Sequence, residues 1–140
     1  MDDPFNLDRF VQAQAGGVFE TALAELKAGA KRSHWMWFIF PQHRDLGRSG
    51  TARFYGLSGK EEARAYAGHP VLGPRLRQCV AAILTPLERM SAEAILGPVD
   101  ALKLCSSMEI FAETVKNEPI FRQVLDAAKC PSSPKMGGKA

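Results

Sequence analysis

The residues best able to do chemistry surround one aromatic stretch, residues 35–40, which holds two tryptophans and two phenylalanines. Two cations, a hydroxyl and an imidazole precede it, and an amide follows. Cations beside aromatic faces suit a planar anionic ligand such as a nucleotide, because rings stack on its base and cations bind its phosphate. The alternative is a core segment whose basic flanks only reach water. The candidate ligand-binding residues here are Lys31, Arg32, Ser33, His34, Trp37 and Gln42.

Two further polar clusters lie elsewhere in the chain. Arg48 and Ser49 stand in a short glycine-flanked loop, which is typical of phosphate-binding loops but also of many surface turns. Lys103 and Ser107 are spaced to share one helical face, and the alternative partner of Lys103 is Asp100, one turn away. We add Arg48, Ser49, Lys103 and Ser107 to the candidate set. A small-anion site predicts that all three clusters meet in one cavity.

No reaction can be assigned from these residues. Imidazole titrates near neutrality, which makes His34 the candidate for acid–base work, yet no carboxylate lies close in the sequence to orient it. The sequence contains no P-loop, GxGxxG, HExxH, nucleophile elbow or EF-hand loop. We therefore predict no cofactor and no metal site, and leave catalytic residues unassigned.

Composition places the chain among ordinary globular domains. Its 140 residues are 46% apolar and 24% charged, and the formal net charge of +3 is too small to argue for nucleic-acid binding. No apolar run approaches the roughly 20 residues of a membrane span, and the acidic start is unlike a signal peptide. We expect a soluble, cytoplasmic protein without a membrane partner.

The three cysteines, at 79, 105 and 130, show no zinc-binding spacing. Free, reduced thiols fit a cytoplasmic chain, so we predict that none is bonded to another. Cys79 falls in an apolar stripe, where a thiol behaves as a small hydrophobic group. All three are interpreted as structural.

The hydrophobic periodicity that must position these groups is helical throughout. It predicts an all-α fold of about six or seven short-to-medium helices around the aromatic stretch, which itself forms a short buried helix. Residues 1–128 form the single predicted domain, and 129–140 a disordered tail rich in proline, glycine and serine. The longest predicted helix, 72–87, has Pro74 in its first turn and Pro86 near its end.

Capping residues predict where the other helices start and stop. Helices are expected over 5–14, 18–27, from 58 to 66, after 91, around 104–115 and after 117, with 42–56 as a loop. The predicted N-caps are Asn6, Ser33, Ser58 in a capping box with Glu61, Ser91 and Asn117, and Gly29 is the predicted C-terminal stop.

Several long strings resemble a bacterial and mycobacterial family, domain of unknown function 1810, sometimes carried under a calpastatin label that these residues do not support. They include SHWMWFIFPQ (33–42) and HPVLGPRL (69–76), and the resemblance runs from about residue 3 to 126. It implies a compact, nearly all-helical domain and no established activity. Two departures stand out: Cys105 replaces a usual arginine, and the sequence after Asp126 lacks a usual aromatic-glycine segment.

Three functions are consistent with these residues. The first is binding of a small anionic, nucleotide-like ligand, with catalysis left open. The alternative is a protein-interaction module that uses a helical groove. The third is weak nucleic-acid binding through Arg44, Arg48 and Arg53 together with Lys31 and Arg32, which the low net charge places last.

Overall fold

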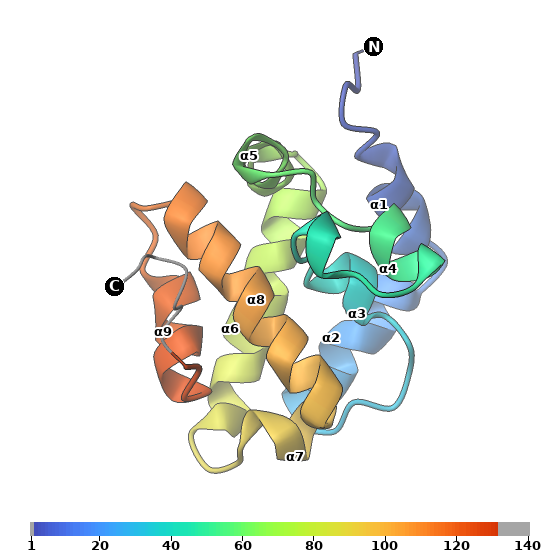
Figure 1. Cartoon of the computed structure of the whole chain (residues 1–140). Coiled ribbons are helices and arrows are strands. Elements are labelled where there is room, and N and C mark those ends of the chain that lie inside the picture. Colours follow the sequence, from blue (N-terminus) through green and yellow to red (C-terminus); the bar gives the residue numbers. More distant parts are fainter. Residues whose placement is uncertain (1, 132–140) are drawn as a thin grey trace.

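The structure, a computed structural model, describes residues 2–131 and is helical throughout (Figure 1). Within these residues there are nine α-helices, one 3-10 helix and no strand, only an isolated bridge between His43 and Leu57. The predicted all-α fold is confirmed, with more short helices than expected. The segments are α1 (Asp8–Ala13), α2 (Val18–Ala28), α3 (Met36–Ile39), η1 (Arg44–Leu46), α4 (Gly50–Phe54), α5 (Lys60–Gly68), α6 (Leu72–Leu87), α7 (Ala92–Leu96), α8 (Pro98–Thr114) and α9 (Ile120–Ala127).

The core forms where the long helices pack together. Helix α6 packs against α2, α5 and α9, while α8 packs against α5, α7 and α9 (Figure 1). The aromatic stretch is interior as predicted: Trp35 is 1% exposed and α3 is a short buried helix. The largest fully buried side chains are Trp35, Tyr66, Phe10, Phe40, Phe111 and Phe121. Each aromatic side chain removes on the order of 150–250 Å² from water, so this cluster dominates burial.

One polar network lies inside this core and fixes α3. The side-chain amide of Gln14 and the hydroxyl of Tyr66 both donate to the Phe38 carbonyl, at 2.8 and 2.9 Å. Burial raises the pKa of Tyr66 above its ordinary value, so the hydroxyl keeps its proton and remains a donor. The end of α3 therefore has its carbonyl satisfied away from water.

Several predicted helix ends are confirmed. Helix α6 begins at Leu72, holds Pro74 in its first turn and ends just after Pro86. Gly29 ends α2 in the left-handed conformation, with φ of 70°. The Ser91 hydroxyl caps α7 by accepting from the Ala94 N–H at 3.0 Å.

Other predicted caps and one predicted loop were wrong. Asp3, not Asn6, accepts from the amides that begin α1. The loop expected over 42–56 contains η1 and α4. Helix α3 begins after Trp35 instead of Ser33, and α9 after Pro119 instead of Asn117.

The predicted capping box at the start of α5 was also wrong. Ser58 donates both its amide and its hydroxyl to Glu62, each at 2.9 Å, and α5 begins after Gly59. Glu62 is 3% exposed, which places this carboxylate inside the molecule. Its ion pair with Arg9 explains why Glu62, rather than the exposed Glu61, takes this role.

The prediction of three free thiols was wrong for two of them. Cys105 on α8 and Cys130 after α9 form a disulfide, because the short connection 115–119 returns the chain along α8 and brings their Cα atoms to 5.7 Å. Cys79 is free and buried, and burial raises its pKa to about 12 although Arg75 opposes the rise. Cys130 falls in the predicted tail, whose residues 132–140 lie outside the described part.

Candidate functional site

Glu25 on α2 positions the polar segment that precedes the aromatic stretch. One carboxylate oxygen accepts from the Arg32 and Ser33 amides and from the Trp35 indole N–H, at 2.8, 3.0 and 2.8 Å, and the other accepts from the Ser33 hydroxyl at 2.6 Å. Desolvation tends to raise the pKa of this carboxyl, but the four hydrogen bonds outweigh it and lower the pKa to about 2. Sequence reasoning missed Glu25, which lies in a regular helical pattern with no local sign of this role.

Two of the three predicted clusters meet at Asp100. The Lys31 ammonium lies 3.1 Å from one carboxylate oxygen of Asp100, and that of Lys103 lies 3.8 Å from the other. Each ammonium also lies over an indole, Lys31 over Trp35 at 5.1 Å and Lys103 over Trp37 at 5.4 Å. One carboxylate and two rings thus already satisfy both cations. Neither lysine lines any of the hollows described below.

The remaining predicted residues do not join that cluster. The Ser49 hydroxyl caps α4 by accepting from Ala52 at 3.1 Å, and Arg48 is exposed with no hydrogen bond or ion pair from its side chain within residues 2–131. Gln42 is half-buried, and its carbonyl accepts from the Leu57 amide. Ser107 is fully buried on α8, and its hydroxyl has no hydrogen-bond partner in the described structure.

His34 is exposed and lines a hollow of about 310 Å³ beside Ser33, Trp35 and the first turn of α2. No carboxylate lines this hollow, so nothing there orients the imidazole for acid–base work.

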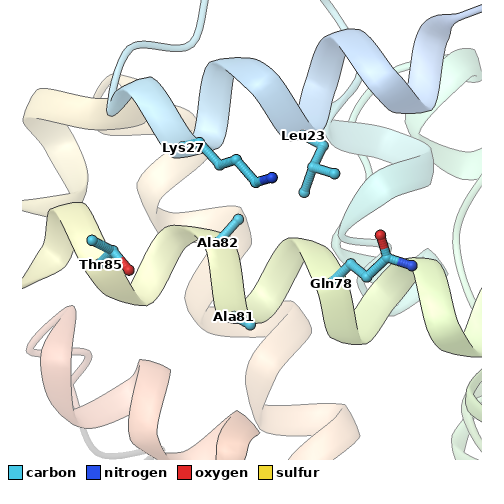
Figure 2. Close-up of a pocket in the computed structure, with 6 residues that line it drawn as sticks. All are labelled: Leu23, Lys27, Gln78, Ala81, Ala82 and Thr85. Carbon is cyan, nitrogen blue, oxygen red and sulfur yellow. The ribbon is translucent and has the colours of Figure 1, made fainter.

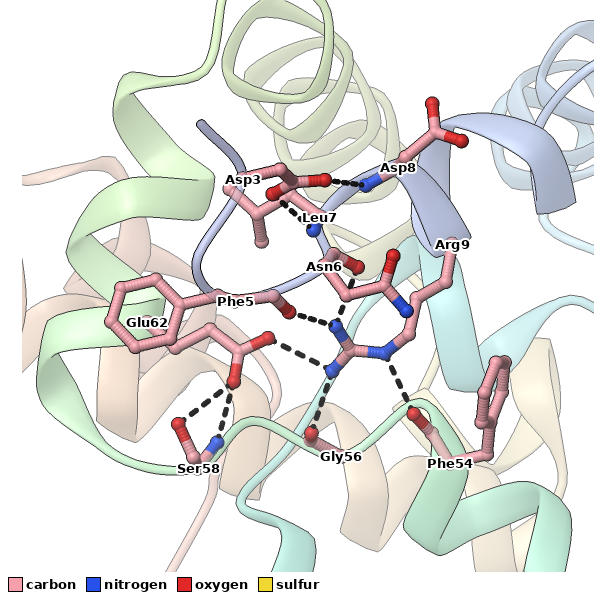
Figure 3. Close-up of polar contacts among 10 residues, drawn as sticks. All are labelled: Asp3, Phe5, Asn6, Leu7, Asp8, Arg9, Phe54, Gly56, Ser58 and Glu62. Carbon is pink, nitrogen blue, oxygen red and sulfur yellow. Dashed lines mark hydrogen bonds and ion pairs between the residues drawn. The ribbon is translucent and has the colours of Figure 1, made fainter. Parts of the chain in front are cut away.

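A second polar centre, which sequence reasoning did not find, is built around Arg9 of α1 (Figure 3). Its guanidinium donates to the carbonyls of Phe5, Asn6, Phe54 and Gly56, at 2.6 to 3.0 Å, and to the Glu62 carboxylate at 2.8 Å. These contacts use all five N–H donors of arginine. Arg9 therefore joins the start of the chain, the end of α4 and the first turn of α5 into one rigid frame.

That frame forms one wall of a hollow of about 360 Å³, which we call the arginine pocket. Arg44 of η1 and Arg53 of α4 are exposed and line it, and neither forms an ion pair within residues 2–131. The Phe54 ring, 56% exposed, stands beside them. Its lining residues are Pro4, Phe5, Asn6, Arg9, Arg44, Arg53, Phe54, Gly56, Ser58 and Glu62.

A larger groove of about 540 Å³ runs between α8, η1 and the start of α5. Its charged lining is mainly acidic, with Asp45, Glu109 and Glu113 against Lys60, which lies 3.4 Å from Glu113. Ser106 and His43, which adjoin the predicted residues Ser107 and Gln42, are among the residues that line this α8 groove.

A further hollow of about 470 Å³ lies between α2 and α6 (Figure 2). It is lined by small or flexible side chains, Leu23, Lys27, Gln78, Ala81, Ala82 and Thr85. Among the described residues, its charged lining consists of Lys27, with no carboxylate. Within residues 2–131 no three metal-ligating side chains cluster, and no helix combines the length and apolar character needed to cross a membrane.

Together, the helical fold and the arginine-lined hollow define a small α-helical domain with a partly neutralised cationic pocket. The chain belongs to the family DUF1810, proteins of unknown function, whose sequence model matches residues 4–131. It is similar in structure to the conserved hypothetical protein Rv1873 of Mycobacterium tuberculosis, with a TM-score of 0.89 and 46% identity over 96% of this chain and 94% of that one. No curated protein matches the chain. The predicted family is thus confirmed.

Proposed function

We propose that this protein binds a small anionic ligand with a planar group, such as a nucleotide, in the arginine pocket. The observation that carries the proposal is the pair Arg44 and Arg53, two guanidiniums on one hollow with no carboxylate partner in the described part of the chain. Arginine presents a planar set of donors that matches phosphate and carboxylate groups. The charge of Arg9 is already balanced by Glu62, so the pocket retains a positive charge from the other two.

The exposed Phe54 ring supports the planar part of the ligand. A phenylalanine 56% exposed beside two arginines offers aromatic surface on which a base can stack, and the Arg9 guanidinium lies over the same ring at 6.0 Å. Its edge-to-face contact with Tyr55, at 4.9 Å between centroids, limits the ring's movement. The pocket volume of about 360 Å³ lies within the range of small-ligand sites.

The other places considered are less suited to an anion. At Asp100 the two lysines already share one carboxylate and each covers an indole. The α8 groove is lined by Asp45, Glu109 and Glu113, and its Lys60 already pairs with Glu113. The arginine pocket is therefore the proposed ligand site, in place of the residues around Lys31 and Lys103.

A thermal-shift screen tests the proposal with adenosine, AMP, ADP and inorganic pyrophosphate. A ligand at 100 times its dissociation constant stabilises the folded protein by about 2.7 kcal/mol, so binding gives a clear shift. We expect AMP and ADP to bind and adenosine to bind far more weakly. Arg44→Gln and Arg53→Gln should each weaken AMP binding, whereas Arg48→Gln, equally exposed in the same segment but outside the pocket, should not.

A second variant separates stacking from charge. Phe54→Leu should weaken AMP binding and leave pyrophosphate binding unchanged, because only the nucleotide uses the ring. If all four compounds leave the melting temperature unchanged, or if Arg48→Gln weakens binding as much as Arg53→Gln, the arginine pocket is not the site. Retention of an oligonucleotide with steep salt dependence, without mononucleotide binding, would instead indicate the nucleic-acid function.

A protein-interaction module is the second candidate. Leu46, 51% exposed, lines the α8 groove, and Val99 and Leu102, each 64% exposed, precede the lining residue Ser106 on α8. Helical grooves of this kind accept amphipathic segments. Selective capture of a partner that Leu102→Ser abolishes, with no effect of the arginine-pocket variants, would favour this function.

A further inference from the structure

The disulfide between Cys105 and Cys130 is placed where it can be opened without taking the fold apart. Both cysteines are half-buried, so a thiol reductant can reach the bond. Cys105 lies on the surface side of α8, between the exposed Leu102 and the half-buried Glu109, and Cys130 follows the exposed Lys129. Accessible disulfides of this kind exchange with small thiols far more readily than buried ones.

Helix α9 is held to the core by contacts that do not involve this bond. Phe121 and Val124 are fully buried, and the Phe121 ring stacks on Phe111 of α8 with centroids 5.6 Å apart. Just before α9, Glu118 forms two hydrogen bonds with Arg77 of α6, at 2.7 and 2.6 Å. This pairing raises the pKa of Arg77 and lowers that of Glu118, so both stay charged near neutral pH. The start and middle of α9 therefore remain docked when the disulfide opens.

The last turn after α9, by contrast, depends on the bond. Lys129 has a φ of 56°, a left-handed conformation that is unfavourable for a residue with a side chain. Two main-chain bonds close this turn, from the Lys129 amide to Asp126 and from the Cys130 amide to Leu125, at 3.1 and 2.9 Å. Side chains at 127, 128 and 130 are only half-buried, so little apolar burial opposes relaxation.

We propose that Cys105–Cys130 is a reversible redox latch that fastens the end of α9 to α8. A thiolate of a dithiol reductant attacks one sulfur and releases the other cysteine as a thiolate, which takes up a proton to become a thiol. The second thiol of the reductant then resolves the mixed disulfide. The protein gains two electrons and two protons, and the reductant becomes a cyclic disulfide. Because α9 stays docked, the two thiols remain near each other and an oxidant restores the bond.

Cys79 makes the latch easy to follow. It is buried in α6 and its pKa is raised to about 12, so its thiol is unreactive while the protein stays folded. Native-state labelling therefore reports only on Cys105 and Cys130. This inference is independent of anion binding, because neither cysteine lines the arginine pocket.

The test uses the full chain with dithiothreitol as the reductant and iodoacetamide as the label. We expect the folded protein to take up no label before reduction, two labels after it, and a third only in denaturant. Reduction should also remove hydrogen-exchange protection at the Lys129 and Cys130 amides while α6 and α8 keep theirs. Oxidised dithiothreitol should restore both the protection and the unlabelled state.

Three outcomes would overturn the latch. A requirement for denaturant during reduction would make the bond a buried structural link. Loss of protection in α6 and α8 on reduction would make the bond essential for folding. Failure of the reduced protein to reoxidise at neutral pH would show that opening is not reversible. Cys105→Ser gives an independent check, since this variant should show the open pattern of exchange without reductant, while Cys79→Ala should keep a working latch.

Discussion

Glu25→Gln tests how much the loop before the aromatic stretch depends on one charge. Glutamine keeps the size of the side chain and one acceptor oxygen, but removes the negative charge that receives four hydrogen bonds. Three of those donors belong to residues 32 and 33, and the fourth is the indole N–H of Trp35, whose ring is buried. We expect the variant to fold and to be less stable than the wild type at pH 7.

The size of the loss follows from the pKa of Glu25. A fall from an ordinary 4.5 to about 2 in the folded state corresponds to about 3 kcal/mol, because each pKa unit is worth about 1.4 kcal/mol. The carboxylate is partly exposed, and solvent screening reduces this to about 2 kcal/mol. Because the folded-state pKa is the lower one, this stability is fully present above about pH 4.5 and is lost as the pH falls towards 2.

Urea unfolding followed by tryptophan fluorescence measures both quantities. The free energy of unfolding should differ between wild type and Glu25→Gln by about 2 kcal/mol at pH 7, and the difference should shrink steadily towards pH 2.5. Other carboxyl groups titrate in both proteins and cancel in this difference. Glu20→Gln, an exposed change in the first turn of the same helix, should show a smaller and flatter effect. A difference that stays constant from pH 7 to pH 2.5 would refute the reasoning.

Three further changes follow from the structure. Arg9→Met leaves the buried carboxylate of its partner unpaired and should lower the free energy of unfolding by about 3–5 kcal/mol in urea, whereas Arg64→Met on an exposed face should change little. Cys105→Ser removes a cross-link between residues 25 apart and should cost about 3.5 kcal/mol in the chain-entropy description, a loss that reductant should reproduce in the wild type but not in the variant. Ser107→Ala removes a buried hydroxyl without a hydrogen-bond partner, so its melting temperature should equal or exceed that of the wild type; a clear decrease would reveal an unseen partner for the hydroxyl.

The helices were predictable where the signal is local. The apolar spacing of α6, its two prolines and the serine before α7 act within a few residues, and the structure follows them. The aromatic stretch was correctly placed inside and in a helical turn, because so many bulky rings in one run have to be buried.

The errors concern partners that are distant in the sequence. Serine is a favoured N-cap residue, but the amide and the hydroxyl of Ser33 both donate to the Glu25 carboxylate, and Ser33 does not cap α3. Ser58 donates to Glu62 rather than to Glu61, because Glu62 is the residue that forms the buried ion pair with Arg9 of α1. The disulfide and the arginine pocket likewise depend on how helices come together, which no spacing along the chain records.

The spacing of Asp100 and Lys103 indicates that these two residues can pair. It does not indicate that Lys31 pairs with the same carboxylate. Those residues lie about seventy positions apart and meet only because the chain around α7 turns back towards α2, where the Lys31 amide donates to the Ile95 carbonyl at 2.9 Å. The sequence therefore indicated the two lysines separately and did not indicate that both pair with the carboxylate of Asp100.

All five N–H donors of the Arg9 guanidinium are used in hydrogen bonds, and this has a consequence for synthesis on the ribosome. Arg9 is synthesised before three of the five acceptors that its guanidinium binds, which follow it by 45 to 53 positions. Until those positions leave the exit tunnel, the guanidinium lacks these partners and stays partly hydrated. Nascent chains in which residue 62 is still inside the tunnel should accordingly be cut by protease near Phe5, and chains in which it has emerged should resist, so this segment becomes native only after the first turn of α5 has emerged.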